Sequence, residues 1–258
     1  MDERYEFKYF VDERHIPTIR QTALAVGGRD SHAGPDGTYV IRSLYLDTRD
    51  LLLYEANDRE AHDRFKVRVR SYPSATSPYG NAPVFLEIKR RTGDVIRKSR
   101  APVSPHVWQA ITRGDAAALQ ALPSRSRPAA EKFMEKVLHY HLEPAELVQY
   151  TREAFASKID IYARVTLDTR IAGQPPIGLT LEANDRRWRP VDGPRLIGAT
   201  VHSVLELKFQ HEPPRWMSAM VKRLDLYRFS FSKYGYSIES ERTVDMSLRT
   251  PTIARGSA

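Results

Sequence analysis

Residues 65–72, FKVRVRSY, place three cations on one face of a predicted strand. Lys66, Arg68 and Arg70 alternate with two valines, which is the two-residue period of a half-buried strand. Like charges two residues apart repel one another, and nothing in a strand requires them. The row therefore indicates a site for an anion with several charges, such as a chain of phosphates, because a single carboxylate would not match three cations.

Four further predicted strands repeat this alternation, with long charged side chains on one face and large apolar ones on the other. The polar faces carry Arg4, Glu6 and Lys8; Glu87 and Lys89; Arg164, Thr166 and Asp168; and Glu206 and Lys208. An ordinary solvent-exposed face also contains many serine, threonine and glutamine residues, which these faces nearly lack. For any single strand, a plain wet face remains the alternative.

The carboxylates on these faces point to a metal ion. Glu87 and Glu206 each stand two residues before a lysine, and a surface built only for a nucleic-acid backbone gains nothing from them. One or two carboxylates together with phosphate oxygens are a usual way to hold Mg²⁺. The two motifs therefore predict a phosphate site with Mg²⁺ or Mn²⁺, both of which accept this ligand set. The alternative is that each glutamate neutralises its neighbouring lysine.

The elements that must position these residues are mainly strands. Strands are predicted over 4–11, 38–47, 64–72, 83–91, 95–103, 147–155, 162–171, 178–185 and 203–210. Helices are predicted from Asp12 to about Val26, over 128–141 and over 213–227.

We predict an α+β fold in which mainly antiparallel strands close into a tunnel-like β-barrel with flanking helices, since closure removes exposed strand edges. With helices on the outside, the charged faces point inward. Burying so many cations without counter-charge costs several kcal/mol of desolvation free energy for each, so they must be hydrated or neutralised by a strongly anionic ligand. Residues 1–245 are expected to form one domain and residues 246–258 a flexible tail.

Composition and missing motifs narrow the function further. The 258 residues carry a net charge of +8 and contain no cysteine, which favours an anionic partner and excludes thiolate chemistry. The start, MDERYEFKYF, does not look like a signal peptide, and no apolar run reaches the ~20 residues of a membrane span. We therefore expect a cytoplasmic protein. Phosphate-binding glycine loops, an H-E-x-x-H zinc motif and a G-x-S-x-G elbow are absent from the sequence.

An ordered set of segments gives a more specific indication. The segments are YEFKYFV, SLYLDTRDLLLYEANDREAHDRFKVRVRSY, FLEIKRRTGDVIRKSR, YTREAFASKIDIYARVTLDT, SVLELKFQHEPPRWM and FSFSKYGYSIES. Together, over roughly residues 4 to 240, they resemble the polyphosphate polymerase (VTC) domain of vacuolar transporter chaperone complexes. That family belongs to the CYTH-like triphosphate tunnel metalloenzymes.

The resemblance implies roles for individual residues. The residues implied to line the tunnel and bind the triphosphate and the growing chain are Lys8, Arg68, Arg70, Lys89, Lys98, Arg152 and Arg164. Glu206 would hold the metal ion, with Glu87 and Glu6 as further candidates, and Lys233 beside Ser232 would contact phosphate. Lys66 and Lys208 are added as substrate-binding residues because they share these strand faces.

Two departures from the family pattern matter. The superfamily's E-x-E-x-K signature appears as RYEFK, with Arg4 in the first glutamate position. This argues against a simple triphosphatase or class IV adenylyl cyclase, which use both carboxylates for metal. Ser230 stands where a second lysine is expected, and Arg228 is the candidate to compensate for it.

The activity implied by the resemblance is a metal-dependent ATP:polyphosphate phosphotransferase. It would transfer the γ-phosphate of ATP onto a growing inorganic polyphosphate chain inside the basic tunnel and release ADP, with no side-chain nucleophile. The alternatives are a triphosphatase or polyphosphatase of the same superfamily, and a non-catalytic binder of polyphosphate or nucleic acid. A nucleic-acid partner is not expected, because such proteins interleave exposed aromatic residues with their cations, whereas Val67, Val69, Leu205 and Leu207 have the pattern of core residues.

Overall fold

The computed structural model describes residues 4–30, 33–73, 82–93, 95–191 and 202–249. Within these ranges, eight strands follow one antiparallel path in the order β1-β10-β8-β7-β3-β4-β5-β6, while β2 pairs with β7 and β9 with β8. The strands are β1 (Arg4–Asp12), β2 (Gly27–Arg29), β3 (Thr38–Asp47), β4 (Asp63–Ser71), β5 (Val84–Thr92), β6 (Val95–Val103), β7 (Glu143–Ser157), β8 (Arg164–Gln174), β9 (Arg189–Pro190) and β10 (His202–Gln210).

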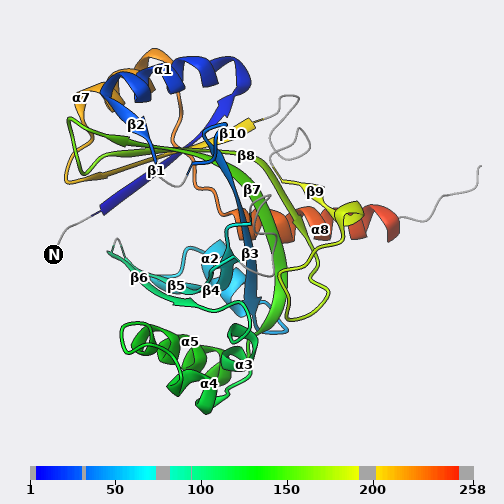
Figure 1. The fold of residues 1–258 in the computed structure, drawn as a ribbon. Coiled ribbons are helices and arrows are strands. Elements are labelled where there is room, and N and C mark those ends of the chain that lie inside the picture. The colour runs from blue at the N-terminus through cyan, green and yellow to red at the C-terminus, as the bar shows by residue number, and fades with distance from the viewer. Residues whose placement is uncertain (1–3, 31–32, 74–81, 94, 192–201, 250–258) are drawn as a thin grey trace, which may run out of the picture.

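The sheet is bent into a C. Figure 1 shows β1, β10 and β8 in one arm, β4, β5 and β6 in the other, and the long strands β3 and β7 at the bend. The pairings among the described residues do not join β1 to β6, so the two ends of the path meet only through side chains, as where Lys89 of β5 donates to Glu6 of β1 at 3.4 Å. The predicted α+β class with an antiparallel sheet is confirmed, whereas closure into a barrel stays a prediction.

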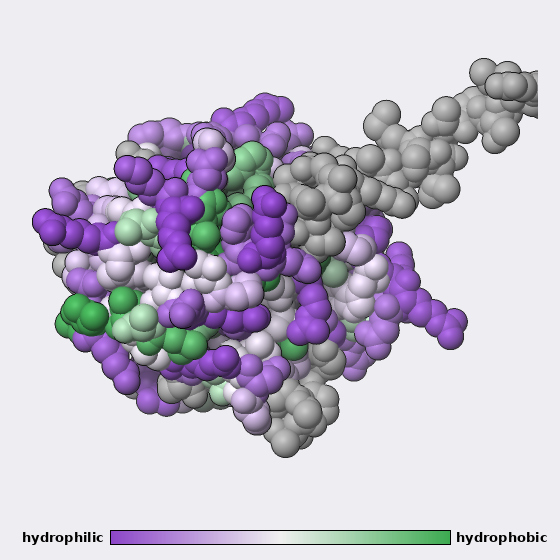
Figure 2. All heavy atoms as spheres, turned by 90° about the horizontal axis from the view of Figure 1, so that it is seen from above, coloured by the Kyte–Doolittle hydropathy of each residue, from purple (hydrophilic) through white to green (hydrophobic). Residues whose placement is uncertain are grey.

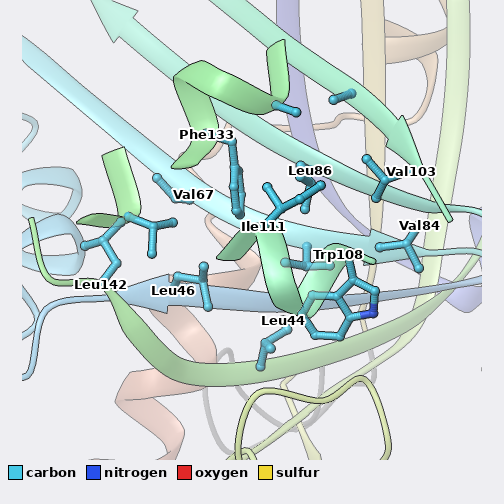
Figure 3. Close-up of a cluster of buried hydrophobic side chains, with 14 of the residues drawn as sticks. Leu44, Leu46, Val67, Val84, Leu86, Val103, Trp108, Ile111, Phe133 and Leu142 are labelled. Carbon is cyan, nitrogen blue, oxygen red and sulfur yellow. The ribbon is translucent and has the colours of Figure 1, made fainter. Parts of the chain in front are cut away.

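Helices cover the outside of both arms. The helices over the β4–β6 arm are α3 (Trp108–Thr112), α4 (Ala116–Gln120) and α5 (Arg127–His139), and those over the β1–β10–β8 arm are α1 (Ile16–Val26) and α7 (Arg215–Arg223). In Figure 3, Phe133 and Trp108 pack on apolar side chains of the strands, including Val67 and Leu86. Seen from the side of α1 and α7, the molecule is mostly hydrophilic (Figure 2).

The alternation along each strand decides which side chains enter these cores. Val67 and Val69 are fully buried under α3–α5, and Leu205 and Leu207 lie in a second core with α1 and α7. Because successive side chains in a strand point to opposite faces, the charged residues between these core residues point into the C. The inward direction predicted for the charged faces is confirmed at these strands.

Two further helices pack against strands of the sheet and against each other. They are α2 (Leu52–Asp58) and α8 (Lys233–Arg249). Asp47, at the end of β3, is fully buried and accepts hydrogen bonds from the backbone N–H groups of Leu53 and Tyr54, both at 2.8 Å. The Tyr234 hydroxyl donates to the same carboxylate at 2.7 Å. One carboxylate thus connects the start of α2 to the start of α8.

The predicted elements and the observed ones differ in a few places. The segment 178–185 was predicted as a strand, which is wrong: it is irregular, follows two prolines, and the Leu181 carbonyl accepts a hydrogen bond from Arg42 at 2.9 Å. α8 continues through residue 249, and residues 250–258 of the expected tail lie outside the described residues. None of the helices in the described ranges is long and apolar enough to cross a membrane.

Candidate functional site

A cavity of about 130 Å³ lies on the inner face of the C-shaped sheet. Nine of its fifteen lining residues are lysine or arginine and two are glutamate. The lining consists of Glu6, Lys8, Tyr45, Lys66, Arg68, Arg70, Lys89, Lys98, Tyr150, Arg152, Glu206, Lys208, Phe231, Ser232 and Lys233. A larger cavity, of about 310 Å³ at Glu143 and Glu241, shares no lining residue with it and contains one arginine, so the smaller cavity is the candidate anion site.

Two arginines of β4 are held by neighbours on the adjoining strands. Arg68 donates to Glu87 at 2.7 Å and to the Tyr45 hydroxyl at 3.1 Å. Arg70 lies 3.7 Å from the same carboxylate and donates to the Ser43 hydroxyl at 3.1 Å. Burial raises the pKa of Glu87, but Arg68 and Arg70 outweigh that effect and lower it to about 2. Both guanidinium groups are therefore pre-oriented over an ionised carboxylate.

A second network joins β7, β8, β10 and α8 around Asp168, which is fully buried. The Arg152 guanidinium donates two hydrogen bonds to Asp168, at 2.6 and 2.7 Å, and lies 3.5 Å from Glu206. Lys233 Nζ lies 2.6 Å from Asp168 and 3.2 Å from Glu206. Burial lowers the pKa of Lys233, but these two carboxylates outweigh it and hold the pKa above its ordinary value. Lys233 is thus fixed as a cation at the cavity wall.

The two cavity carboxylates are each surrounded by lysines. Glu206 lies 2.9 Å from Lys208, and Glu6 lies 3.4 Å from Lys89. Burial and the charge of Glu206 raise the pKa of Glu6, but Lys89, Lys208 and Lys8 outweigh them and lower it. Burial also raises the pKa of Glu206, and Lys208, Lys233 and Arg152 hold it well below the ordinary value. Both carboxylates face the cavity in the ionised form.

The two cavity carboxylates fit a divalent cation whose remaining ligands would be phosphate oxygens. Among the residues that the structure describes, no three His, Cys, Asp or Glu side chains converge as a complete metal site. Glu6 and Glu206, however, both line the cavity, and one or two carboxylates plus phosphate oxygens suffice for Mg²⁺. Glu87 does not line the cavity and is paired with arginines, which favours a neutralising role for it.

Burial lowers the pKa of two lysines in the cavity. Lys66 donates to the Ser232 hydroxyl at 2.8 Å, and burial together with Lys8 and Lys89 keeps its pKa well below the ordinary value. Burial lowers the pKa of Lys89 to about 7, even though Glu6 opposes the change. The cavity therefore carries more cations than its own carboxylates neutralise, and an anion inside it would stabilise the protonated lysines.

Comparison with known proteins places this chain in a family. The family model described as VTC domain matches residues 3–241. The chain belongs to the VTC domain family.

Two relatives are subunit 4 of the vacuolar transporter chaperone complex. The Trypanosoma brucei brucei protein is 27% identical over 226 residues, and the Trypanosoma cruzi protein is 25% identical over 231 residues. The alignments cover 77% and 78% of this chain but 28% of each relative, so the chain spans less than a third of their length.

A solved structure shares the fold of this VTC domain. It is a Hippeastrum protein, an adenylyl cyclase candidate in which a triphosphatase activity dominates. It aligns with a TM-score of 0.51 at 12% identity and covers 93% of this chain and 96% of its own.

The VTC domain brings together most of the predicted site residues but not all of them. Arg164 is exposed on β8, opposite Lys208, and does not line the cavity. Lys98 lines it, although 61% of its side chain is exposed. Ser230 donates to Glu60 at 3.5 Å and lies outside the lining, as does Arg228, so neither replaces the expected second lysine there.

Sequence reasoning missed four residues of the VTC site. Tyr45 and Tyr150 line the cavity and contact its cations, since Arg68 lies over the first ring at 5.8 Å and Lys233 over the second at 4.8 Å. Phe231 also lines the cavity, and Asp168 orients two of the cavity cations, Arg152 and Lys233. Two of them carry a signal in the alternating pattern, because Asp168 shares its strand face with Thr166 and Tyr150 stands two residues before Arg152 on the same strand. Phe231 lies outside the strands and carries no such signal.

Proposed function

We propose that this VTC domain is a metal-dependent polyphosphate polymerase. It transfers the γ-phosphate of ATP to a growing inorganic polyphosphate chain and releases ADP. The observation that carries the proposal is the cavity with nine lysine and arginine residues and two ionised glutamates, formed by the inner faces of the sheet together with the start of α8. A polyphosphate bears negative charge on every phosphate group, so it matches a row of cations better than a ligand with one charged group does.

The cations serve as electrostatic clamps in this proposal. Phosphoryl transfer requires in-line positioning of the attacking and leaving oxygens and neutralisation of charge on the transferring group. Arg68, Arg70 and Arg152 are already oriented by Glu87 and Asp168, and arginine can grip two phosphate oxygens at once. The lysines act as point charges along the same path. The acceptor phosphate is itself anionic, so no side-chain nucleophile is needed.

The metal ion is part of the proposal. Glu206 and Glu6 would hold Mn²⁺ or Mg²⁺ together with oxygens of the phosphates. When bound there, such an ion would supply Lewis-acid stabilisation of the charge on those oxygens. We also propose that the two arms of the sheet enclose the polyphosphate as a tunnel, because the Lys89–Glu6 contact bridges the arms.

Incubation of the purified protein with ATP and Mn²⁺ tests this function. Long-chain polyphosphate together with ADP supports it. Release of orthophosphate favours the triphosphatase alternative, which the fold shared with the Hippeastrum protein makes relevant. Absence of turnover despite phosphate binding favours a non-catalytic binder.

A pair of variants tests the role of Glu206. Glu206→Gln should abolish synthesis while tripolyphosphate still binds without metal, because the cations remain. Glu212→Gln, at an exposed position after β10, is the matched control and should leave synthesis unchanged. Retained synthesis in Glu206→Gln would contradict the metal assignment and favour a purely neutralising carboxylate.

A further inference from the structure

An aromatic series leads from the cavity to the solvent in the segment between α7 and α8. Phe231 lines the cavity and is 4% exposed, whereas Phe229 is 46% exposed and Tyr227 is 77% exposed. Large apolar side chains are usually buried, and a graded exposure that begins at a charged cavity calls for a physical reason.

The backbone of this segment is fixed to a strand that lines the cavity. Arg228 forms a β-bridge with Tyr9 of β1, and the Phe229 N–H donates to the Lys8 carbonyl at 2.9 Å. Lys8 in turn donates from Nζ to the Phe231 carbonyl at 2.7 Å. The positions of the exposed aromatic residues are therefore tied to a cavity lysine.

Ring contacts support Phe229 from the protein side. Its ring centroid lies 4.7 Å from that of Phe10 and 6.3 Å from that of Tyr236. Phe10 and Tyr236 also contact Phe231, at 5.2 and 4.7 Å. The rings of Phe10 and Tyr236 thus lie between Phe229 and Phe231 of the cavity wall, and they support one side of Phe229 while nearly half of its surface remains exposed.

We propose that Phe229 and Tyr227 form a stacking platform for the base of the nucleotide whose phosphates occupy the cavity. This inference rests on the proposed function and identifies where the nucleoside part of the substrate binds. In ATP the ribose and the α-phosphate separate the base from the γ-phosphate, so a base site must lie outside a phosphate cavity. The small, densely charged cavity offers no flat apolar surface of comparable exposure.

Stacking determines what such a platform can distinguish. Aromatic rings stack on the face that every base possesses, and they tolerate different bases. The platform should therefore bind ATP and GTP with similar affinity, while inorganic tripolyphosphate, which has no base, does not use it. This difference separates the platform from the cavity in an experiment.

Calorimetric titration of ATP and of tripolyphosphate, without metal to prevent turnover, tests the proposal. The Tyr227→Ala/Phe229→Ala double variant should bind ATP about tenfold more weakly, as expected for loss of base stacking, and should bind tripolyphosphate unchanged. Phe229→Leu, which keeps apolar volume but removes the flat face, should also weaken ATP binding, whereas Phe229→Trp, which keeps a flat ring, should bind ATP as the wild type does. Tyr162→Ala removes a partly exposed aromatic residue outside the cavity lining and is the matched control.

The outcomes separate this inference from the proposed function. Unchanged ATP affinity in the double variant overturns the platform, and so does an equal loss for ATP and tripolyphosphate, which would indicate a disturbed cavity. Stronger binding of oligonucleotides than of ATP at these rings would also overturn it. If the wild-type protein binds neither ATP nor tripolyphosphate, the proposed function fails and the platform fails with it.

Discussion

Asp168 is a fully buried carboxylate between two cations of the cavity wall, Arg152 and Lys233. Burial raises its pKa, but these two cations outweigh the effect and keep it ionised. Removing one partner from such a buried network leaves the other charges uncompensated, which is far more costly than losing an exposed ion pair. The residue acts on the site through the two cations that it holds.

Asp168→Asn is therefore expected to lower the free energy of unfolding by about 3 kcal/mol. Tripolyphosphate should stabilise this variant more than it stabilises the wild type, because the bound anion replaces part of the lost negative charge. Urea unfolding with and without tripolyphosphate measures both effects. Asp63→Asn, which breaks an exposed pair with Arg90, should change stability little, and an equal loss in the two variants would contradict the role of Asp168.

Alternation along single strands predicted the inward face of Lys66, Arg68 and Lys208, because the two-residue period is a local property of the backbone. It could not predict the partner of Asp168. That contact depends on the register between β7 and β8, which shifts between Gln149 and Thr151. Arg164 has the same alternation yet lies outside the cavity, so a shared face does not ensure a shared site.

At the scale of elements, the beginning of α8 packs closely against β8. Gly173 of β8 faces Ser237 of α8 so closely that an added Cβ would lie 1.6 Å from the Ser237 hydroxyl oxygen and 2.6 Å from Glu146 Oε1. No side chain fits between β8 and α8 at this point. Since α8 begins with Lys233, a shift of the helix would displace a cavity cation.

Gly173→Ala should consequently reduce the free energy of unfolding by about 2 kcal/mol, the usual scale of overpacking, and weaken tripolyphosphate binding. Thermal unfolding and titration measure the two effects. Gly28→Ala is the control, because its added Cβ would contact only the end of Lys158, at 3.7 Å. Normal tripolyphosphate affinity in a destabilised Gly173→Ala protein would show that α8 does not position Lys233.

The packing of α8 should also depend on pH through Glu146, which is fully buried. Ser237 donates to it at 2.5 Å, Arg189 lies 3.9 Å away, and Glu241 of α8 adds negative charge. Burial is the main reason that its pKa rises from 4.5 to about 7. Because the folded state holds the proton more tightly, the stabilisation is complete below about pH 4.5 and is lost as the pH rises through 7.

Raising the pH from 5.5 to 8.5 should cost the wild type about 2 kcal/mol more stability than it costs Glu146→Gln, since the amide cannot ionise. Urea unfolding of both proteins across this pH range gives the difference. Parallel pH profiles would mean that Glu146 keeps the same charge throughout.

Eight strands and three helices were predictable as elements because their hydrophobic periodicity is strong. The short helices α2, α3 and α4 were not predicted, and neither was α8, which is held by polar contacts: Tyr234 with Asp47 and Ser237 with Glu146. Its apolar pattern is weak and Gly235 lies in its first turn. The strand prediction for residues 178–185 was wrong for the opposite reason: a short alternating run looks like a strand, but none of the strands in the described part of the chain pairs with it.

At the scale of the whole molecule, the C-shaped sheet turns two amphipathic arms into one charged interior. The helices on the outside accept the apolar faces, so the charged faces of the two arms turn toward each other around the cavity. The sequence pattern could predict this inside-out arrangement, because apolar helix faces and apolar strand faces must meet. It could not predict how the ends of the sheet meet, since the relation of β1 to β6 involves residues nearly a hundred positions apart.

Titration of inorganic tripolyphosphate into the wild type, Arg68→Met and Arg90→Met tests most directly whether this interior holds a phosphate chain. Arg68 lines the cavity, and Arg90 is exposed on the neighbouring strand β5 with Asp63 as its partner. We predict at least about tenfold weaker binding for Arg68→Met, on the scale of one charge-assisted contact to phosphate, and unchanged binding for Arg90→Met. Equal weakening by both substitutions, or no binding by the wild type, would contradict a phosphate-chain site between the two arms.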